Sequence, residues 1–196
     1  MSKIRVAIFA SGSGTNAECI VNYFKGHNQI EVSIILSNKP DAYVLQRAAD
    51  LNVPSHVFGR QELYESEELI NFLSERNIDA IVLAGFLWLI PASLIKNYLN
   101  KIINIHPALL PAFGGKGMYG ERVHRAIIKN GEWRSGITIH LVNERYDEGA
   151  ILLQADCKVS SVDTPGSLAQ KIHQLEYKHY PNVIEDYLLK YIDTLG

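Results

Sequence analysis

Short apolar segments alternate with amphipathic ones along the first half of the chain. The apolar segments are rich in Ile, Val and Leu and nearly unbroken, which is typical of strands that are covered on both faces of a sheet. Strands are therefore expected at Ile4–Phe9, Ile30–Leu36, Val53–Phe58, Asp79–Ala84 and Lys101–Ile105.

The segments between these strands have the helical repeat of apolar and polar positions. Helices are expected at Thr15–Phe24, Ala42–Leu51, Gln61–Arg76 and Ala92–Leu99. Asp41 is a candidate N-cap for the second of these helices. Strands that alternate with helices in this way form a parallel sheet with helices on both faces, joined by right-handed connections.

The second half of the chain has a different pattern. Residues 108–120 are rich in glycine, which predicts a loop, and Glu121–Lys129 follows as a helix. Ser135–Val142 and Ile151–Val159 alternate as two antiparallel strands, and a long helix opens at residues 164–167. The expected fold class is α/β and Rossmann-like, with a mostly parallel sheet and antiparallel strands in the C-terminal half. We expect residues 1–196 to form a single domain.

Composition excludes several classes of protein. Of 196 residues, 47% are apolar and 20% are charged, as in globular proteins, and the net charge of −2 lacks the basic footprint of a nucleic-acid binder. Cys19 and Cys157 form no CxxC pair, so neither a disulfide framework nor a zinc site is expected. The longest apolar run, residues 80–92, is too short for a bilayer, and the N-terminus lacks a signal-peptide pattern. We expect a cytoplasmic protein without a membrane partner.

A glycine turn follows the first predicted strand. The segment Ser11-Gly-Ser-Gly-Thr-Asn16 leads into a helix, where free backbone N–H groups and the helix dipole favour a phosphate. It is not a Walker A motif, and its GxGxxA spacing fits a dinucleotide fold whose usual acidic residue is missing after the second strand. A plain strand-to-helix turn explains the segment equally well.

Asn104 and His106 follow one another at alternate positions at the end of the fifth strand, so their side chains share a face. An amide can donate to a developing oxyanion, and a histidine can move a proton at neutral pH. Ligands bind at this carboxyl edge of such sheets, which favours a catalytic pair over a lone histidine in a turn.

The other polar candidates have simpler interpretations. Asp147-Glu-Gly149 is also typical of a solvated turn, and His140 of packing or partial exposure within a strand. His124 and His173 lie on predicted helices, where a surface or interface role is expected. No group has metal-ligand spacing, so no metal is predicted.

Several motifs together resemble a known family. They are Phe9-Ala-Ser-Gly-Ser-Gly-Thr-Asn16, Ser37-Asn-Lys39, Leu83-Ala-Gly-Phe86, Asn104-Ile-His-Pro-Ala-Leu-Leu-Pro111 and Tyr146-Asp-Glu-Gly149. In this order and spacing, from residue 4 to about residue 181, the chain resembles the folate-dependent phosphoribosylglycinamide formyltransferases of purine synthesis.

The resemblance implies roles for particular residues. The family's catalytic Asn, His and Asp fall on Asn104, His106 and Asp147. The stretch that holds the nucleotide phosphate falls on Gly14, Thr15 and Asn16, and a family acid that contacts the nucleotide falls on Glu176.

The folate-binding residues implied by the resemblance are Leu87, Trp88, Leu89 and Ile90, with Asn104 at the reacting end and Arg60, across a gap, near the folate tail. Trp88 stands where the family often has a basic residue. The loop after Pro111 resembles the family only in outline, so no ligand contact is carried over to it.

The resemblance also implies the reaction. The amine of glycinamide ribonucleotide attacks the formyl group of 10-formyltetrahydrofolate, the co-substrate, through a tetrahedral intermediate, with Asn104 and a protonated His106 stabilising the oxyanion and Asp147 orienting His106 or a water. The implied partners are these two small molecules, with neither nucleic acid nor metal, and the chain is expected to be a monomer or a homodimer.

Three alternatives remain. Formyltetrahydrofolate deformylase would hydrolyse the same donor, but it usually has His-His where this chain has His106-Pro107. Methionyl-tRNA formyltransferase shares the Asn-x-His-Pro motif but needs a basic tRNA-binding domain. A catalytically silent Rossmann-like module would bind a phosphate or nucleotide without turnover.

Overall fold

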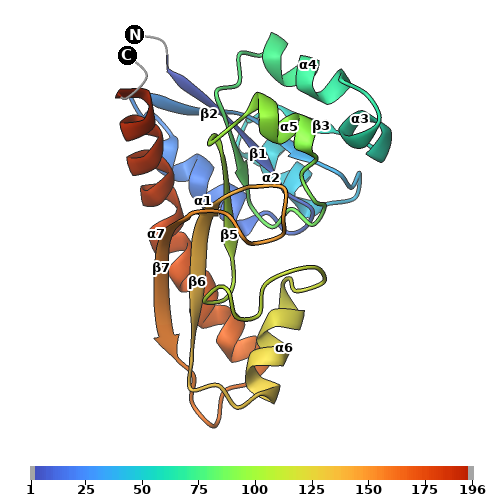
Figure 1. Ribbon diagram of the computed structural model, residues 1–196. Helices are drawn as coiled ribbons and strands as arrows, with labels where there is room; N and C mark the ends of the chain where they lie inside the picture. The colour runs from blue at the N-terminus through green and yellow to red at the C-terminus, as the bar shows by residue number, and fades with distance from the viewer. Residues whose placement is uncertain (1–2, 194–196) are drawn as a thin grey trace.

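The computed structural model describes residues 3–193, and these form one seven-stranded sheet covered by helices on both faces (Figure 1). The strands are β1 (Ile4–Phe9), β2 (Ile30–Ser37), β3 (Ser55–Val57), β4 (Ala80–Leu83), β5 (Ile102–His106), β6 (Arg134–Leu141) and β7 (Ile151–Lys158). The helices are α1 (Thr15–Phe24), α2 (Tyr43–Asp50), α3 (Arg60–Tyr64), α4 (Glu68–Glu75), α5 (Ala92–Asn97), α6 (Glu121–Lys129) and α7 (Pro165–Asp193).

The strand order β3-β2-β1-β4-β5-β6-β7 confirms the predicted fold class. The first five strands are parallel, whereas β6 and β7 run antiparallel to their neighbours. The order reverses between β1 and β4, and ligands bind at such a switch point, outside the carboxyl ends of the strands.

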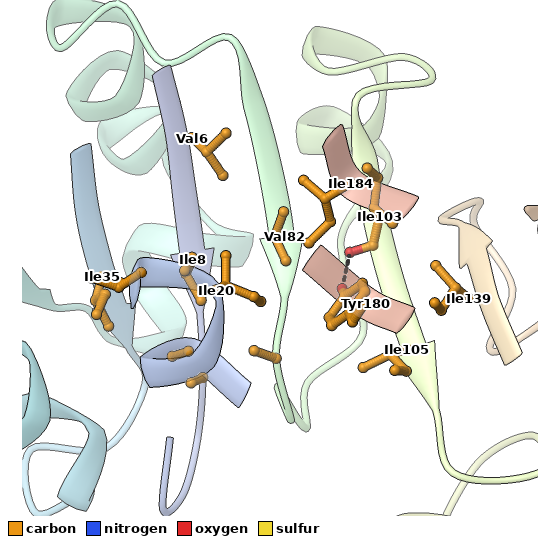
Figure 2. Close-up of a cluster of buried hydrophobic side chains, with 14 of the residues drawn as sticks. Val6, Ile8, Ile20, Ile35, Val82, Ile103, Ile105, Ile139, Tyr180 and Ile184 are labelled. Atoms are coloured by element: carbon orange, nitrogen blue, oxygen red, sulfur yellow. Dashed lines mark hydrogen bonds between the residues drawn. The ribbon is translucent and has the colours of Figure 1, made fainter. Parts of the chain in front are cut away.

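Alternate residues of the strands enter two hydrophobic cores, one on each face of the sheet. Val6 and Ile8 of β1 pack with α1, α2, α6 and α7, while Ala7 and Phe9 pack with α3, α4 and α5. Figure 2 shows the first core, in which Val82 of β4 and Ile103 of β5 lie near α7. Because both faces are covered, the parallel strands β1 and β4 at the centre of the sheet are mostly apolar, as the sequence indicated.

Two predicted local features are wrong. Asp41 does not cap α2, whose N-cap is Ala42 without a side-chain cap; instead the Val44 N–H donates to the Gly12 carbonyl at 3.1 Å. This bond satisfies a free donor of the first turn and ties α2 to the glycine turn.

The helix predicted over Gln61–Arg76 is in fact two helices, α3 and α4. Between them the Ser66 hydroxyl accepts a hydrogen bond from the Glu68 N–H at 3.4 Å. Such local side-chain bonds compete with the helical ones. Among residues 3–193, no helix combines the length and apolar character of a membrane span.

Candidate active site

A cleft of about 610 Å³ opens at the carboxyl ends of β1, β4 and β5. The segments at the ends of these three strands line it, with residues 11–16, 83–90 and 104–107. Residues 115–120 and the β6–β7 connection complete the walls. The volume lies within the range of small-molecule sites.

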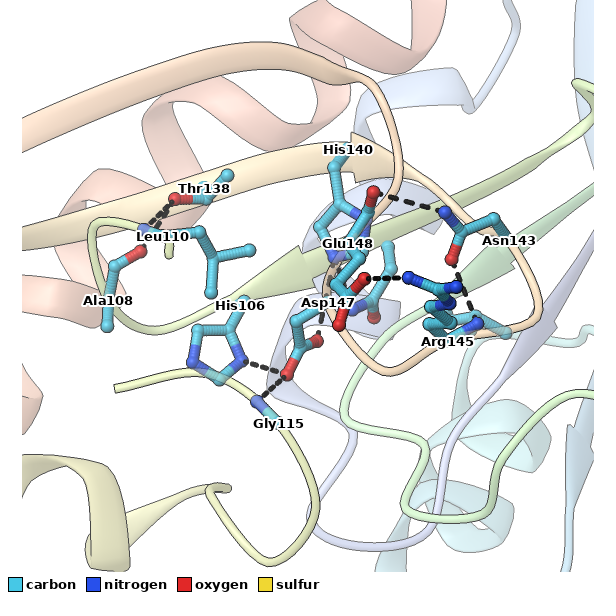
Figure 3. Close-up of polar contacts among 12 residues, drawn as sticks. His106, Ala108, Leu110, Gly115, Thr138, His140, Asn143, Arg145, Asp147 and Glu148 are labelled. Atoms are coloured by element: carbon cyan, nitrogen blue, oxygen red, sulfur yellow. Dashed lines mark hydrogen bonds and ion pairs between the residues drawn. The ribbon is translucent and has the colours of Figure 1, made fainter. Parts of the chain in front are cut away.

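The side chains of His106 and Asp147 meet in this cleft, although they lie 41 positions apart in sequence (147 − 106). The Asp147 Oδ2 atom is 3.5 Å from His106 Nδ1 and accepts a hydrogen bond from the Gly115 N–H at 2.9 Å (Figure 3). Asp147 has a φ of +58°, a left-handed conformation that Asp and Asn adopt more readily than most residues.

His140 is a site residue that the sequence analysis missed. It is 2% exposed, and β5–β6 pairing places it opposite Asn104, so that its Nε2 lies 3.1 Å from Asn104 Nδ2 and 3.7 Å from Asp147 Oδ1. The expectation of mere packing or partial exposure is therefore wrong. Only the strand register brings His140 to the predicted pair, and a register is not visible in either strand alone.

The chain after His106 is held by a buried hydroxyl. Thr138, opposite His106 on β6, donates to the Ala108 carbonyl at 2.7 Å and accepts from the Leu110 N–H at 3.0 Å (Figure 3). Thr138 has no exposed surface. This contact fixes the turn through which the strand leaves the catalytic histidine candidate.

Opposing effects act on the proton of His106. Burial lowers its pKa, whereas the charge of Asp147 and the hydrogen bond to the Phe113 carbonyl act in the other direction without cancelling it. His106 Nε2 lies 2.8 Å from that carbonyl, so Nε2 carries a hydrogen. Asp147 keeps a lowered pKa: burial raises it, but His140, His106 and the Gly115 N–H together outweigh burial. The site therefore pairs an ionised carboxylate with an imidazole that prefers to be neutral.

The glycine turn lies at the start of α1. Gly14 has a φ of +77°, and a Cβ there would lie 2.4 Å from Val44 Cγ2, so only glycine fits. Gly14 makes no side-chain cap, which leaves the N–H groups of the first turn to the cleft. Ser11 fixes the turn against the segment after β4, because its hydroxyl accepts from the Leu87 N–H at 3.0 Å.

Comparison with known proteins decides the family. The family model described as formyl transferase matches residues 4–184. The chain belongs to the formyl transferase family.

Two relatives in this family carry the same name. Over 186 residues the chain is 40% identical to the chloroplastic phosphoribosylglycinamide formyltransferase of Arabidopsis thaliana, covering 92% of this chain and 64% of that protein. It is 38% identical to the phosphoribosylglycinamide formyltransferase of Bacillus subtilis (strain 168), over 94% of each chain. The chain thus spans less than two thirds of the plant relative and nearly all of the bacterial one.

Solved structures agree with this likeness. The phosphoribosylglycinamide formyltransferase from Bacillus halodurans superposes with a TM-score of 0.84 at 37% identity, covering 94% of this chain and 95% of that one. Glycinamide ribonucleotide transformylase 1 from Geobacillus kaustophilus also has a TM-score of 0.84 at 37% identity, over 93% and 97% of the two chains.

Within this formyl transferase, Asn16 and Glu176 join α1 to α7. Asn16 Nδ2 donates to Glu176 Oε2 at 2.9 Å, and both residues line the cleft together with Gly14 and Thr15. Burial raises the pKa of Glu176 to about 7, while the Asn16 hydrogen bond acts against that rise. The acid that the resemblance assigned to the nucleotide thus lies beside the predicted phosphate turn.

The segment predicted to bind folate forms another wall of the cleft: Leu87, Trp88, Leu89 and Ile90 all line it. The Trp88 ring packs edge-on against Phe58 and Phe86. Arg60 does not line the cleft; its guanidinium lies 4.8 Å from the centroid of the Trp88 ring, on the side chain that replaces the usual basic residue. Its place near the folate tail stays a prediction.

His124 and His173 also line the cleft. His173 is exposed, as expected for a surface residue, whereas the expectation of a surface role is wrong for His124. His124 is 3% exposed, and its Nδ1 has no hydrogen-bond partner among the described residues. Burial, followed by the charge of His173, lowers the pKa of His124 to about 4. Across residues 3–193, no group of three or more His, Cys, Asp and Glu is arranged to hold a metal ion.

Proposed function

We propose that this protein transfers the formyl group of 10-formyltetrahydrofolate to the amine of glycinamide ribonucleotide. The convergence of Asn104, His106 and Asp147 in one cleft, between a phosphate turn and an apolar wall, supports the proposal most directly. A transfer between two small molecules needs both to lie in one cleft, with the reacting groups between them. The names of the relatives agree with this reaction.

The residues present fit both substrates. The start of α1 offers backbone N–H groups to a phosphate, and Leu87–Ile90 offer an apolar wall to the flat ring of a folate. Ser11 holds these two walls at a fixed separation, since its backbone N–H donates to the Gly85 carbonyl at 3.1 Å and its hydroxyl accepts from Leu87.

Asn104 and His106 act on the charge that develops when the amine attacks the formyl carbon. Asn104 donates an N–H to the formyl oxygen, and one such donor is typically worth about 3 kcal/mol in the transition state. His106 prefers to be neutral in this site, so it takes up a proton as the amine loses one, and the nearby Asp147 carboxylate stabilises the imidazolium. When the tetrahedral intermediate collapses, the bond between the formyl carbon and folate N10 breaks, and the imidazolium returns the proton to N10 so that tetrahydrofolate can leave. The protonated imidazole that the resemblance implied thus arises during the reaction.

Release of tetrahydrofolate, followed spectrally, tests the proposal. We expect release from 10-formyltetrahydrofolate only when glycinamide ribonucleotide is present. Equal release without the nucleotide would identify a deformylase, and nucleotide binding without any turnover would identify a silent module; either outcome overturns the proposal.

Asp147→Asn gives a sharper version of this test. Asparagine also accepts the left-handed backbone, so the variant removes the charge and leaves the turn in place. We expect kcat to fall by about 10²-fold or more with little change in nucleotide affinity. Glu148→Gln, which alters an exposed carboxylate paired with Arg145, is the matched control and keeps its activity. A collapse of nucleotide affinity in Asp147→Asn would contradict the assigned role.

The remaining expectations belong to this proposal. The partners are the two small-molecule substrates, without nucleic acid. A monomeric or homodimeric state, a cytoplasmic location and the absence of a metal stay predictions.

A further inference from the structure

Two basic side chains of the cleft lack a carboxylate partner. Lys116, in the loop between β5 and α6, and Arg122, in the first turn of α6, both line the cleft. Among the described residues neither forms an ion pair; Arg122 lies over the ring of Tyr119, 4.9 Å from its centroid. By contrast Arg145, also in the cleft, is paired with Glu148 at 3.2 Å.

The first turn of α6, which carries Arg122, is linked to the nucleotide end of the cleft through His124 and α7. Glu176 on α7 contacts Asn16 at the start of α1, and His173 lies one turn earlier on α7, about 5 Å along the helix axis. His173 is close enough to His124 to influence it electrostatically, and His124 follows Arg122 by two positions on α6. One turn of α7 therefore connects the N-terminal ends of α1 and α6.

The phosphate turn itself lacks an available cation. A phosphate monoester carries a charge of about −1.5 to −2 at neutral pH, whereas a helix N-terminus offers only about half a positive charge. Arg47 lies nearby, but its guanidinium donates to the Ser13 carbonyl at 2.9 Å and pairs with Glu18. Additional positive charge would strengthen phosphate binding, and Lys116 and Arg122 are basic residues of the same cleft without a carboxylate partner.

An independent observation also points to a ligand here. His124 is almost fully buried at this end of the cleft, yet its Nδ1 has no hydrogen-bond partner in residues 3–193. Buried polar atoms are nearly always paired in native proteins. A polar ligand bound beside α6 would account for the exception.

We propose that Lys116 and Arg122 bind the phosphate of the nucleotide substrate and make the enzyme specific for the phosphorylated form. This inference rests on the proposed function. The neighbour of Lys116, Gly115, donates its N–H to Asp147, so the same loop holds the phosphate and the catalytic carboxylate candidate.

Lys116→Met and Arg122→Met test the inference with two substrates, glycinamide ribonucleotide and its dephosphorylated riboside. Methionine keeps most of the unbranched apolar part of the side chain and removes the charge. We expect each variant to lower kcat/KM for the ribonucleotide by about 10- to 100-fold, mainly through KM, because charge-assisted hydrogen bonds are lost. We expect kcat/KM for the riboside and KM for the folate to stay the same.

Lys129→Met and Arg125→Met are matched controls, because both residues are exposed on α6 and Arg125 is already paired with Glu121 at 2.8 Å. Neither control should change kcat/KM. An equal loss with both substrates, or a rise in KM for the folate alone, would overturn the inference.

Binding of ribose 5-phosphate, measured by calorimetry, separates this inference from the proposed function. If the wild-type protein fails to formylate glycinamide ribonucleotide, the proposed function falls. Weaker ribose 5-phosphate binding in Lys116→Met and Arg122→Met would still support the phosphate site, and unchanged binding would overturn it.

Discussion

The hydrogen bonds of His140 define the orientation of the amide beside it. His140 Nδ1 lies 2.8 Å from the Leu141 carbonyl, which can only accept, so Nδ1 carries a hydrogen. When the ring is neutral, Nε2 is an acceptor for the Asn104 amide at 3.1 Å. This contact uses one N–H of Asn104 and leaves the other for a substrate oxygen. His140 is thus a positioning residue for the predicted oxyanion donor.

Glu176 gives a prediction at this scale. Burial raises its pKa from 4.5 to about 7, so between these pH values the folded state holds a proton that the unfolded state has released. The free energy of unfolding therefore falls as the pH rises through this window. Glu176→Gln keeps an acceptor for Asn16 and removes the charge. We expect it to abolish this fall, which amounts to up to about 3 kcal/mol.

Urea unfolding of the wild type and Glu176→Gln at pH 5 and pH 8 measures this effect. The lowered pKa of His124 has the opposite effect on the free energy of unfolding, which it reduces as the pH falls toward 4. This effect is the same in the wild type and in Glu176→Gln. Glu65→Gln, at an exposed site, should follow the wild type. If the free energy of unfolding of the wild type and of Glu176→Gln changes equally with pH, the pKa of Glu176 is not raised in the folded state.

Pairing between elements places the site at the level of secondary structure. Asn104 meets His140, and His106 meets Thr138, only because β5 and β6 pair in one particular register. The β6–β7 connection then returns Asp147 to the same end of β5. A shift of one residue would turn every side chain to the other face of the sheet.

The β6–β7 connection gives a prediction at the element scale. A Cβ on Gly149 would lie 1.6 Å from the Leu141 carbonyl oxygen, which is backbone and cannot move freely. We expect Gly149→Ala to displace the connection, to lower stability by about 1–3 kcal/mol and to lower kcat by moving Asp147.

Thermal unfolding and steady-state kinetics measure the two effects of Gly149→Ala. Gly59→Ala is the control, because a Cβ there makes only an ordinary contact with Glu62 at 3.6 Å. Wild-type stability and activity in Gly149→Ala would refute the importance of this close approach.

Helix α7 has an internal proline that the tertiary structure accommodates. Pro181 has no N–H, so the carbonyl of Tyr177, four positions earlier, lacks its usual helical partner. The Cys19 thiol of α1 lies 3.6 Å from that carbonyl and donates to it. The thiol thus replaces part of the missing bond where α1 packs on α7.

Across the whole molecule, Tyr180 connects the C-terminal helix to the centre of the sheet. It is fully buried, and its hydroxyl lies 2.9 Å from the Leu83 carbonyl of β4. The same hydroxyl lies 3.0 Å from the Ile103 carbonyl of β5 (Figure 2). These two strands carry the segments that form the cleft. The single domain stays a prediction. The seven strands within residues 3–193 all belong to one sheet.

Tyr180→Phe tests this connection. The variant removes a buried hydroxyl and leaves two carbonyls without that donor, so we expect the free energy of unfolding to fall by about 1–3 kcal/mol. Denaturant unfolding measures the change. Tyr43→Phe, at a residue that is 57% exposed, should cost less than about 0.5 kcal/mol. Equal stability of the two variants would contradict the role of Tyr180.

The sequence by itself determined the strands, their alternation with helices and the edge at which ligands bind. These features depend on local patterns: apolar runs, glycine turns and alternate side chains such as Asn104 and His106. The predicted phosphate turn and the apolar wall also lie in single segments, so their residues could be named in advance.

Tertiary structure alone decided which distant residues join these segments. His140 enters through strand register, His124 through packing of α6 on α7, and Lys116 through the course of a glycine-rich loop. The protonation of His106 depends on burial and on the Phe113 carbonyl. These placements and this protonation state depend on contacts between distant parts of the chain, which no local sequence pattern predicts. Burial and electrostatic fields are properties of the folded molecule.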